Sequence, residues 1–129
     1  MRPKILVVDD DRYTRTLIDR LLGSSAEIHL ASDGAEARRL FACEDFNLVL
    51  MDQCLPADNG IQLLREFRSC RLKLVGILMT GFADVRVAVS AVREGVFDYL
   101  TKPFEDLESF EAVVGKGLEL DAAYREIDG

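Results

Sequence analysis

Five short apolar segments, repeated at similar intervals, constrain the fold of this chain more than any other feature of its sequence. Their carboxyl ends are 20 to 28 residues apart. Each interval therefore has room for one strand, one helix of about 11 residues and two short loops. The segments are continuously apolar rather than alternating, which is typical of parallel strands that helices cover on both faces. They occupy residues 5–8, 26–31, 47–51, 74–79 and 97–100.

The stretches between these segments have the periodicity and the end signals of amphipathic helices. Asp33 and Asp84 stand at expected N-cap positions, and Gly23 and Gly95 follow the ends of two helices. The predicted helices cover residues 12–22, 34–43, 60–68 and 85–94, and a last one begins at about residue 105. The sequence therefore predicts one α/β domain, with a doubly wound five-stranded parallel sheet of the (βα)5 type.

The last two predicted helices are the least regular. Val85, Val89 and Val92 form one apolar stripe on the fourth helix. In the fifth helix, Gly115 and Gly117 each cost about 1 kcal/mol relative to alanine, so we expect its second half to be loosely held. The apolar face of that helix comprises Leu107, Phe110, Val113, Val114 and Leu118.

The composition excludes several classes of protein. Sixteen basic and twenty-three acidic residues give a formal net charge of −7, which repels phosphodiester backbones, so we expect no direct nucleic-acid binding by this segment. The hydrophobic share of 49% is too high for a disordered chain, and no apolar run approaches the roughly 20 residues that span a membrane. Cys43, Cys54 and Cys70 are odd in number and widely spaced, which argues against a disulfide framework and indicates a reducing cytoplasm.

Polar residues of related chemistry directly follow four of the predicted strands. Because the carboxyl ends of parallel strands meet at one edge of a sheet, where ligands bind, we expect these side chains to converge. They are Asp9, Asp10 and Asp11 after the first strand, Asp52 after the third, Thr80 after the fourth, and Thr101 and Lys102 after the fifth.

Such a cluster of carboxylates needs a compensating charge. Two carboxylates about 4 Å apart repel by about 4 kcal/mol at an effective dielectric constant of about 20. Lys102 alone leaves Asp9, Asp10 and Asp52 with a net charge of −2, and hard oxygen ligands at an open edge favour Mg²⁺. Lys102 and Thr80 can each reach a phosphoryl oxygen. The residues are therefore suited to accepting a phosphoryl group on a carboxylate.

Four motifs, in their order along the chain, resemble the receiver domain of bacterial two-component response regulators (CheY-like domains). They are ILVVDD at residues 5–10, LVLMD at 48–52 followed by Leu55, Pro56 and Gly60, ILMTG at 77–81, and FDYLTKPF at 97–104. The resemblance covers the chain from Lys4 to about Leu120, and residues 98–104 most resemble nitrogen-regulator-type receivers, which precede a central ATPase module. It implies a flavodoxin-like strand order, 2-1-3-4-5. We therefore expect a receiver domain at residues 1–120, with residues 121–129 as the end of a helix or a linker to an output domain outside this chain.

The resemblance also implies a role for each residue of the cluster. Asp52 is expected to be the phosphoacceptor, phosphorylated by a sensor histidine kinase. Asp9 and Asp10 are expected to hold Mg²⁺ together with Asp52 and the backbone carbonyl of Cys54. The domain would then be a signalling module rather than an enzyme, with self-catalysed phosphoryl transfer and autodephosphorylation as its only chemistry.

Further expectations from the resemblance concern the switch. Lys102 would neutralise the phosphoryl group, Thr80 would move to bond it, and the rotamer of Tyr99 would follow Thr80. A cis peptide is expected at Lys102–Pro103, the one kind of bond where the cis form is cheap. The readout surface would cover residues 84–118 and support homodimerisation, with Arg86, Arg93 and Glu111 available for ion pairs. Transcription would be regulated through an output domain that is not in this chain.

The loop after Asp52 departs from the family pattern. Leu55 stands where the family often has methionine, and Asp58-Asn59 stands where it commonly has Met-Asp, so the loop is more polar at Asp58. Gln53 and Cys54 lie on the metal side of the loop, where their side chains can tune the access of water to an acyl phosphate.

Simpler interpretations remain for single residues. Asp11 is expected to be only a helix cap, His29 a structural residue, and Tyr99 either a switch or a half-buried structural tyrosine. Cys54 is the one cysteine close enough to the expected pocket to be sensitive to oxidation there.

Three other functions compete with a receiver. A haloacid-dehalogenase-type enzyme also has an acidic loop after its first strand, but Tyr13 stands where that family has threonine or valine, and no acidic pair follows Lys102. A flavin- or nucleotide-binding module would place a glycine- or hydroxyl-rich loop after the first strand, where this chain has three carboxylates. A pseudo-receiver that serves only as a docking surface would not require the acceptor set.

Overall fold

The five apolar segments form the five strands of one parallel sheet. The computed structural model describes residues 2–81, 85–104 and 106–128. Its strands are β1 (Lys4–Val8), β2 (Glu27–Ala31), β3 (Leu48–Asp52), β4 (Gly76–Thr80) and β5 (Asp98–Thr101). Its helices are α1 (Arg12–Leu22), α2 (Gly34–Cys43), α3 (Gly60–Cys70), α4 (Val85–Arg93) and α5 (Leu107–Asp128). The strand order is β2-β1-β3-β4-β5 with every pair parallel, which confirms the predicted (βα)5 fold and its 2-1-3-4-5 order.

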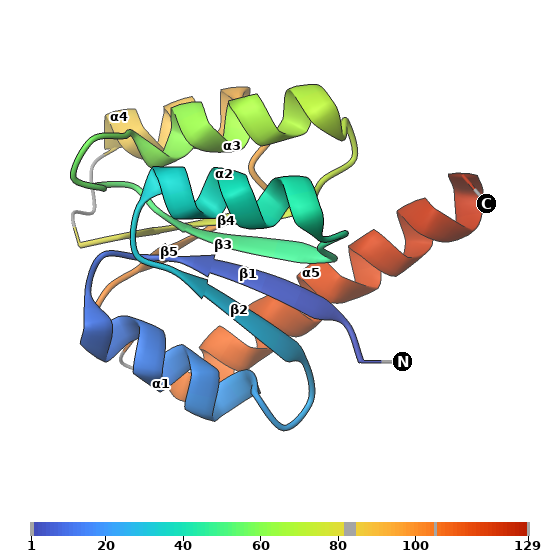
Figure 1. Cartoon of the computed structure of the whole chain (residues 1–129), viewed down its shortest axis with the longest axis horizontal. Helices are drawn as coiled ribbons and strands as arrows, with labels where there is room; N and C mark the ends of the chain where they lie inside the picture. The colour runs from blue at the N-terminus through green and yellow to red at the C-terminus, as the bar shows by residue number, and fades with distance from the viewer. Residues whose placement is uncertain (1, 82–84, 105, 129) are drawn as a thin grey trace.

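Helices cover both faces of the sheet (Figure 1). Helices α1 and α5 lie on one face, and α2, α3 and α4 lie on the other. Successive side chains of a strand point to opposite faces, so Ile5 and Val7 of β1 pack with α1 and α5, while Leu6 and Val8 pack with α2 and α3. All four side chains are fully buried, which explains why the strand sequences show no polar alternation.

Side-chain caps begin the first three helices near the predicted positions. Asp11 accepts a hydrogen bond from the Tyr13 N–H at the start of α1, and Asp33 and Asn59 cap α2 and α3 in the same way. Helix α3 extends to Cys70, two residues past the predicted end, and α4 ends one residue earlier than predicted. The predicted cap Asp84 and the predicted helix start at Glu105 lie outside the described residues.

The apolar stripe of α4 faces solvent rather than the core. Val85 and Val92 are each 77% exposed, and Val89 is 45% exposed. The helix packs against the sheet through Ala91, which is buried, and Val87, which is partly buried. A stripe of apolar residues is therefore present as predicted, but it does not mark the buried face of this helix.

Helix α5 is one continuous helix of 22 residues, so the prediction of a loosely held second half was wrong. Gly117 allows close packing, because a Cβ at this position would lie 3.0 Å from Leu48 Cδ1 and that side chain would have to shift. Further along, Leu120 and Tyr124 pack against the core, and Asp121 is buried. Among the described residues, no helix combines the length and apolarity that a membrane span requires.

Candidate functional site

The polar residues at the strand ends meet in one place, as the parallel topology predicts. The carboxylate oxygens of Asp9, Asp10 and Asp52 lie within 4.8 Å of one another. Lys102 Nζ lies 2.9 Å from Asp9 Oδ2 and 3.5 Å from Asp52 Oδ1. Thr80 is buried at the end of β4, and its carbonyl accepts a hydrogen bond of 2.7 Å from the Lys102 N–H. We call Asp9, Asp10, Asp52 and Lys102 the acidic pocket.

Asp9 is fully buried and is held by its own loop. The N–H of Asp11 donates to Asp9 Oδ1 at 2.9 Å, and the Asp9 N–H donates to the Ala31 carbonyl at 3.0 Å. The guanidinium of Arg15, one turn into α1, donates to the Asp9 carbonyl at 2.8 Å. Asp10 is exposed, so the pair offers one fixed carboxylate and one that is open to solvent.

Asp52 is buried at the end of β3, and its electrostatic environment is unusual for a carboxylate. It is 4% exposed, and its Oδ1 accepts a hydrogen bond of 3.3 Å from the Cys54 N–H. Burial, followed by the charge of Asp9, raises the pKa of Asp52 to about 6, although Lys102 and the Cys54 N–H oppose the shift. At neutral pH the carboxylate is therefore mainly ionised, although its surroundings disfavour the negative charge.

Lys102 provides the single cation of the pocket. Burial lowers the pKa of Lys102, but the hydrogen bond to Asp9 and the charges of Asp9 and Asp52 outweigh burial and raise it above the ordinary value. Lys102 is therefore charged at neutral pH. The Lys102–Pro103 peptide is cis, as expected.

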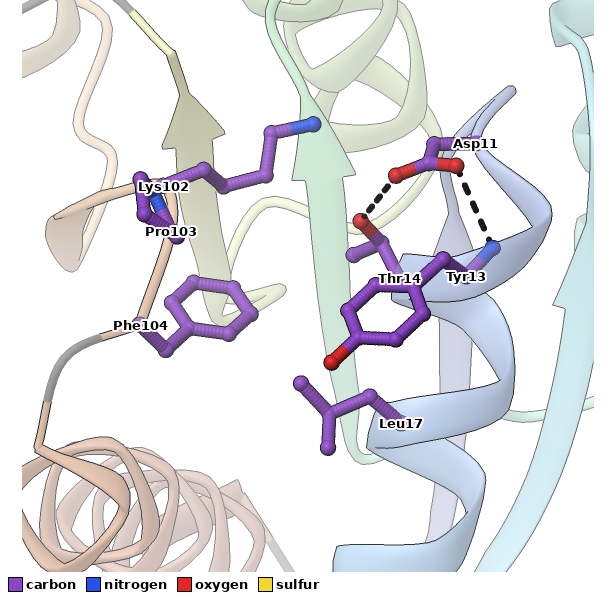
Figure 2. Close-up of a pocket in the computed structure, with 7 residues that line it drawn as sticks. All are labelled: Asp11, Tyr13, Thr14, Leu17, Lys102, Pro103 and Phe104. Carbon is purple, nitrogen blue, oxygen red and sulfur yellow. Dashed lines mark hydrogen bonds between the residues drawn. The ribbon is translucent and has the colours of Figure 1, made fainter.

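A cavity of about 340 Å³ adjoins Lys102 between α1 and the segment that follows β5 (Figure 2). Phe104 lies on the β5 side of this cavity, and Tyr13 and Leu17 lie on the α1 side. Tyr13 is 74% exposed. The other lining residues are Asp11, Thr14, Lys102 and Pro103.

Several other residues singled out from the sequence have structural contacts. Asp11 accepts hydrogen bonds from Tyr13 N and Thr14 Oγ1, as its interpretation as a helix cap predicts. His29 bonds Glu27 and packs edge-on against the Phe46 ring, away from the acidic pocket. Tyr99 is half-buried on β5, opposite Leu78 of β4, and packs against the core on the face that α4 covers. Cys43, Cys54 and Cys70 are free and exposed.

The loop after Asp52 contains an interaction that sequence reasoning missed. Arg38 of α2 donates to Asp58 of this loop at 2.7 Å and to Glu66 of α3 at 2.8 Å. These bonds to Glu66 and Asp58 raise the pKa of Arg38 above its ordinary value. The polar residue Asp58 was visible in the sequence, but its partner is 20 residues earlier in the chain and follows no short-range spacing rule.

The pocket has the donor set that Mg²⁺ prefers. Three carboxylates share a small volume at an edge of the sheet, with one carboxylate exposed and one lysine opposite. Three negative charges and one positive charge leave room for a divalent cation, and hard oxygen donors with access to water are typical of Mg²⁺ sites. The residues present therefore fit that ion.

Comparisons with known proteins support the interpretation of this chain as a receiver domain. The response regulator receiver domain profile matches residues 5–114. The regulatory protein AtoC of Escherichia coli K12 is 39% identical over 125 residues, covering 96% of this chain and 27% of AtoC. The DNA-binding transcriptional regulator NtrC of the same strain is 34% identical, covering 88% of this chain and 24% of NtrC. The crystal structure of NtrX from Brucella abortus in complex with ADP has a TM-score of 0.90 at 30% identity, covering 99% of this chain and 30% of NtrX.

The fold and the acidic pocket define a signalling domain of the CheY-like class. The chain belongs to the response regulator receiver domain family of two-component systems. Relatives such as NtrC confirm its resemblance to nitrogen-regulator-type receivers, and receiver domains generally bind Mg²⁺ at an acidic pocket and partner with sensor histidine kinases. The chain spans about a quarter of the length of AtoC and NtrC. Family membership favours a receiver over the haloacid-dehalogenase-type enzyme and the flavin- or nucleotide-binding module.

Proposed function

We propose that this chain receives a phosphoryl group on Asp52 from the phosphohistidine of a sensor histidine kinase. The observation that supports this most strongly is the position of Asp52, a buried carboxylate 3.5 Å from Lys102 Nζ and grouped with Asp9 and Asp10. The environment that raises the Asp52 pKa to about 6 leaves the group mainly ionised at neutral pH, as a nucleophile must be.

In the transfer, a carboxylate oxygen of Asp52 attacks the phosphorus of the phosphohistidine. The new O–P bond forms as the N–P bond breaks, and the leaving imidazole takes up a proton from solvent. The residues that would hold Mg²⁺ are Asp9, Asp10, Asp52 and the backbone carbonyl of Cys54. When bound, the ion would supply positive charge between the carboxylates and the incoming phosphoryl oxygens.

Lys102 and Thr80 are the proposed ligands of the transferred group. Lys102 is charged and already lies within reach of Asp52, so a phosphoryl oxygen can replace its present bond to Asp9. Thr80 ends the neighbouring strand and can donate its hydroxyl proton to a second oxygen. Both residues therefore stabilise the charge that arrives, without taking part in bond making.

We assign the readout to the face formed by α4, β5 and α5. A phosphorylated Asp52 would draw Thr80 toward it, and Tyr99 on β5 would repack in response. The exposed Val85, Val89 and Val92 of α4 give this face an apolar stripe suited to a second copy of the domain. Molar mass measured with and without a beryllofluoride phosphoryl mimic tests this step: a dimer is expected with the mimic, and an unchanged monomer would contradict it.

The role in the whole protein follows from the relatives. AtoC and NtrC are regulators about four times as long as this chain, so we propose that residues 1–120 are a receiver domain and that residues 121–129 are the end of a helix or a linker to an output domain that regulates transcription. Binding to DNA would belong to that output domain. The free, exposed cysteines suit a cytoplasmic location, where thiols stay reduced.

Intact-mass spectrometry after incubation with acetyl phosphate and Mg²⁺ tests the proposal. The wild type is expected to gain the mass of one phosphoryl group, and Asp52→Asn is expected to gain none. Asp121→Asn is a matched control, since it removes a buried carboxylate at the other edge of the sheet, and it should still be modified. An unmodified wild type, or a fully modified Asp52→Asn, would overturn the proposal and favour a pseudo-receiver or another acceptor.

A further inference from the structure

The peptide group between Cys54 and Leu55 lies just past Asp52, and its two ends face different partners. Under the proposed function, the carbonyl oxygen of Cys54 is a ligand of Mg²⁺. The N–H of the same group, on Leu55, donates a hydrogen bond of 3.2 Å to the backbone carbonyl of Asp58. Because a peptide group is planar, fixing the direction of its N–H also fixes the direction of its carbonyl. The position of Asp58 therefore determines where the Cys54 carbonyl points.

Asp58 is held in turn by helix α2. Arg38 Nη2 donates to Asp58 Oδ1 at 2.7 Å, and the Asp58 side chain is 19% exposed. The carboxylate lies so close to α2 that a Cβ on Gly34 would be 2.1 Å from Asp58 Oδ2. A second donor of the same guanidinium, Arg38 Nε, bonds Glu66 of α3. One guanidinium thus joins the loop to two helices.

The two ends of the loop are held by different means. Near Asp52, the Gly60 N–H donates to the Gln53 carbonyl at 2.9 Å, and Cys54 pairs with Asn59 in an antiparallel bridge. The tip of the loop, residues 55–58, is joined to α2 through the Arg38–Asp58 ion pair. The Leu55 N–H bond to the Asp58 carbonyl and the burial of Leu55 also hold the tip, and the ion pair adds a side-chain link from Asp58 to α2.

We propose that Arg38 and Asp58 are positioning residues for the Mg²⁺ site, acting through the Leu55 N–H to aim the Cys54 carbonyl into the acidic pocket. This inference rests on the proposed function, because Mg²⁺ is the ion that the carbonyl would meet.

The variant Arg38→Gln distinguishes a positioning role of Arg38 from a long-range effect of its charge on Mg²⁺ binding. Removing a positive charge near an acidic pocket should tighten Mg²⁺ binding if only long-range charge matters. Loss of the tether should instead weaken Mg²⁺ binding by about two- to fivefold, the range in which exposed ion pairs shift equilibria. The control is Arg39→Gln, which removes the same charge from the next position of α2, where Arg39 is 67% exposed and lies 3.8 Å from Glu36.

Two measurements follow on the wild type, Arg38→Gln, Arg38→Lys and Arg39→Gln. The first is the Mg²⁺ dissociation constant by calorimetry, and the second is the amide hydrogen-exchange rate of Leu55 without metal. Arg38→Gln is expected to weaken Mg²⁺ binding and to speed Leu55 exchange about threefold or more, whereas Arg39→Gln should do neither. Arg38→Lys, which keeps a cation within reach of Asp58, should restore Mg²⁺ affinity to within about twofold of the wild type.

The results distinguish this inference from the proposed function. Unchanged or tighter Mg²⁺ binding by Arg38→Gln, or unchanged exchange at Leu55, would overturn the positioning role while leaving Mg²⁺ binding by the wild type intact. If the wild type binds no Mg²⁺ at all, the proposed function fails instead, and the metal-free exchange at Leu55 still shows whether the tether exists. Thermal unfolding of each variant verifies that it is folded.

Discussion

Aspartates are buried at both ends of the strands, but their negative charge is compensated at one end and left in excess at the other. At the edge where the strands begin, Asp121 accepts hydrogen bonds from Asn47 Nδ2 at 2.8 Å and Arg125 Nε at 2.7 Å. Arg71 lies 3.7 Å from the same carboxylate. Asp45 bonds both arginines from the surface, completing what we call the basal network: Asn47, Asp45, Arg71, Asp121 and Arg125.

Charge balance distinguishes the two sites. The basal network has two carboxylates and two guanidinium groups, so its charges cancel, and Asp121 has three donors close to it. The acidic pocket has three carboxylates and one lysine, so two negative charges remain. A balanced cluster has no net charge left to compensate, whereas the excess negative charge of an unbalanced one is unfavourable until a cation neutralises it. Substitutions of the same kind should therefore have effects of opposite sign at the two edges.

The largest effect is expected at the basal network. Asp121→Asn leaves Arg125 and Arg71 without their buried partner, and breaking a buried pair from one side is strongly destabilising. Since both arginines are partly exposed, we expect the free energy of unfolding to fall by about 2–3 kcal/mol in urea titrations. Covalent phosphorylation should persist in the folded fraction. A loss below about 0.5 kcal/mol would show that the network is not structural.

The substitution Asp52→Asn should instead increase the free energy of unfolding. In the unfolded chain the Asp52 carboxyl titrates near 3.8, but its folded pKa is about 6, so the folded state binds the proton more tightly. The stability that this proton contributes is fully present below pH 3.8 and is lost as the pH rises through about 6. Near pH 7 without metal, Asp52→Asn should therefore be more stable than the wild type by about 1–3 kcal/mol.

Urea titrations between pH 4 and 7, with a chelator present, check this difference. The stability gap between Asp52→Asn and the wild type should widen with pH and then level off above about pH 6.5. Saturating Mg²⁺ should narrow the gap, because it should stabilise the wild type more than Asp52→Asn, which lacks one of the proposed ligands. A gap that stays constant over this pH range would mean that the Asp52 carboxylate is not strained.

The smallest effect is expected for Asp11, an acid beside the pocket that caps a helix. Asp11→Ala removes the N-cap of α1, which should cost about 1 kcal/mol of unfolding free energy. Phosphorylation by acetyl phosphate should continue, because Asp11 caps the helix rather than joining the carboxylate group. If Asp11→Ala abolished phosphorylation, Asp11 would be part of the phosphorylation site and not only a helix cap.

The parallel α/β architecture and the pocket are predictable from the sequence because both follow from local rules, whereas the strand order was predicted from the family resemblance. Continuously apolar segments indicate parallel strands, and the carboxyl ends of such strands meet at one edge of the sheet. These two rules are enough to group Asp9, Asp52 and Lys102, which the structure places within a few ångströms of one another. The cis peptide before Pro103 follows from the family resemblance, and the structure agrees.

The features that the sequence did not predict depend on contacts between segments that are distant in the chain. The valine stripe of α4 has the pattern of a buried face, but burial depends on which side of the helix meets the sheet, and here Ala91 does. The glycines of α5 have the pattern of weak points, yet Gly117 gives the helix its close approach to Leu48. The ion pair of Arg38 with Asp58 joins residues 20 positions apart, and no periodicity specifies that choice of partner.

Chemical identification of the phosphorylated residue tests the central claim most directly. After reaction with acetyl phosphate and Mg²⁺, borohydride reduces an aspartyl phosphate to homoserine, and peptide mass spectrometry then locates the changed residue. We expect the change at Asp52 alone, in the wild type and in Asp121→Asn. Reduction at Asp9 or Asp10, or at no aspartate of a phosphorylated protein, would contradict the claim that the strained carboxylate of the acidic pocket is the phosphoacceptor.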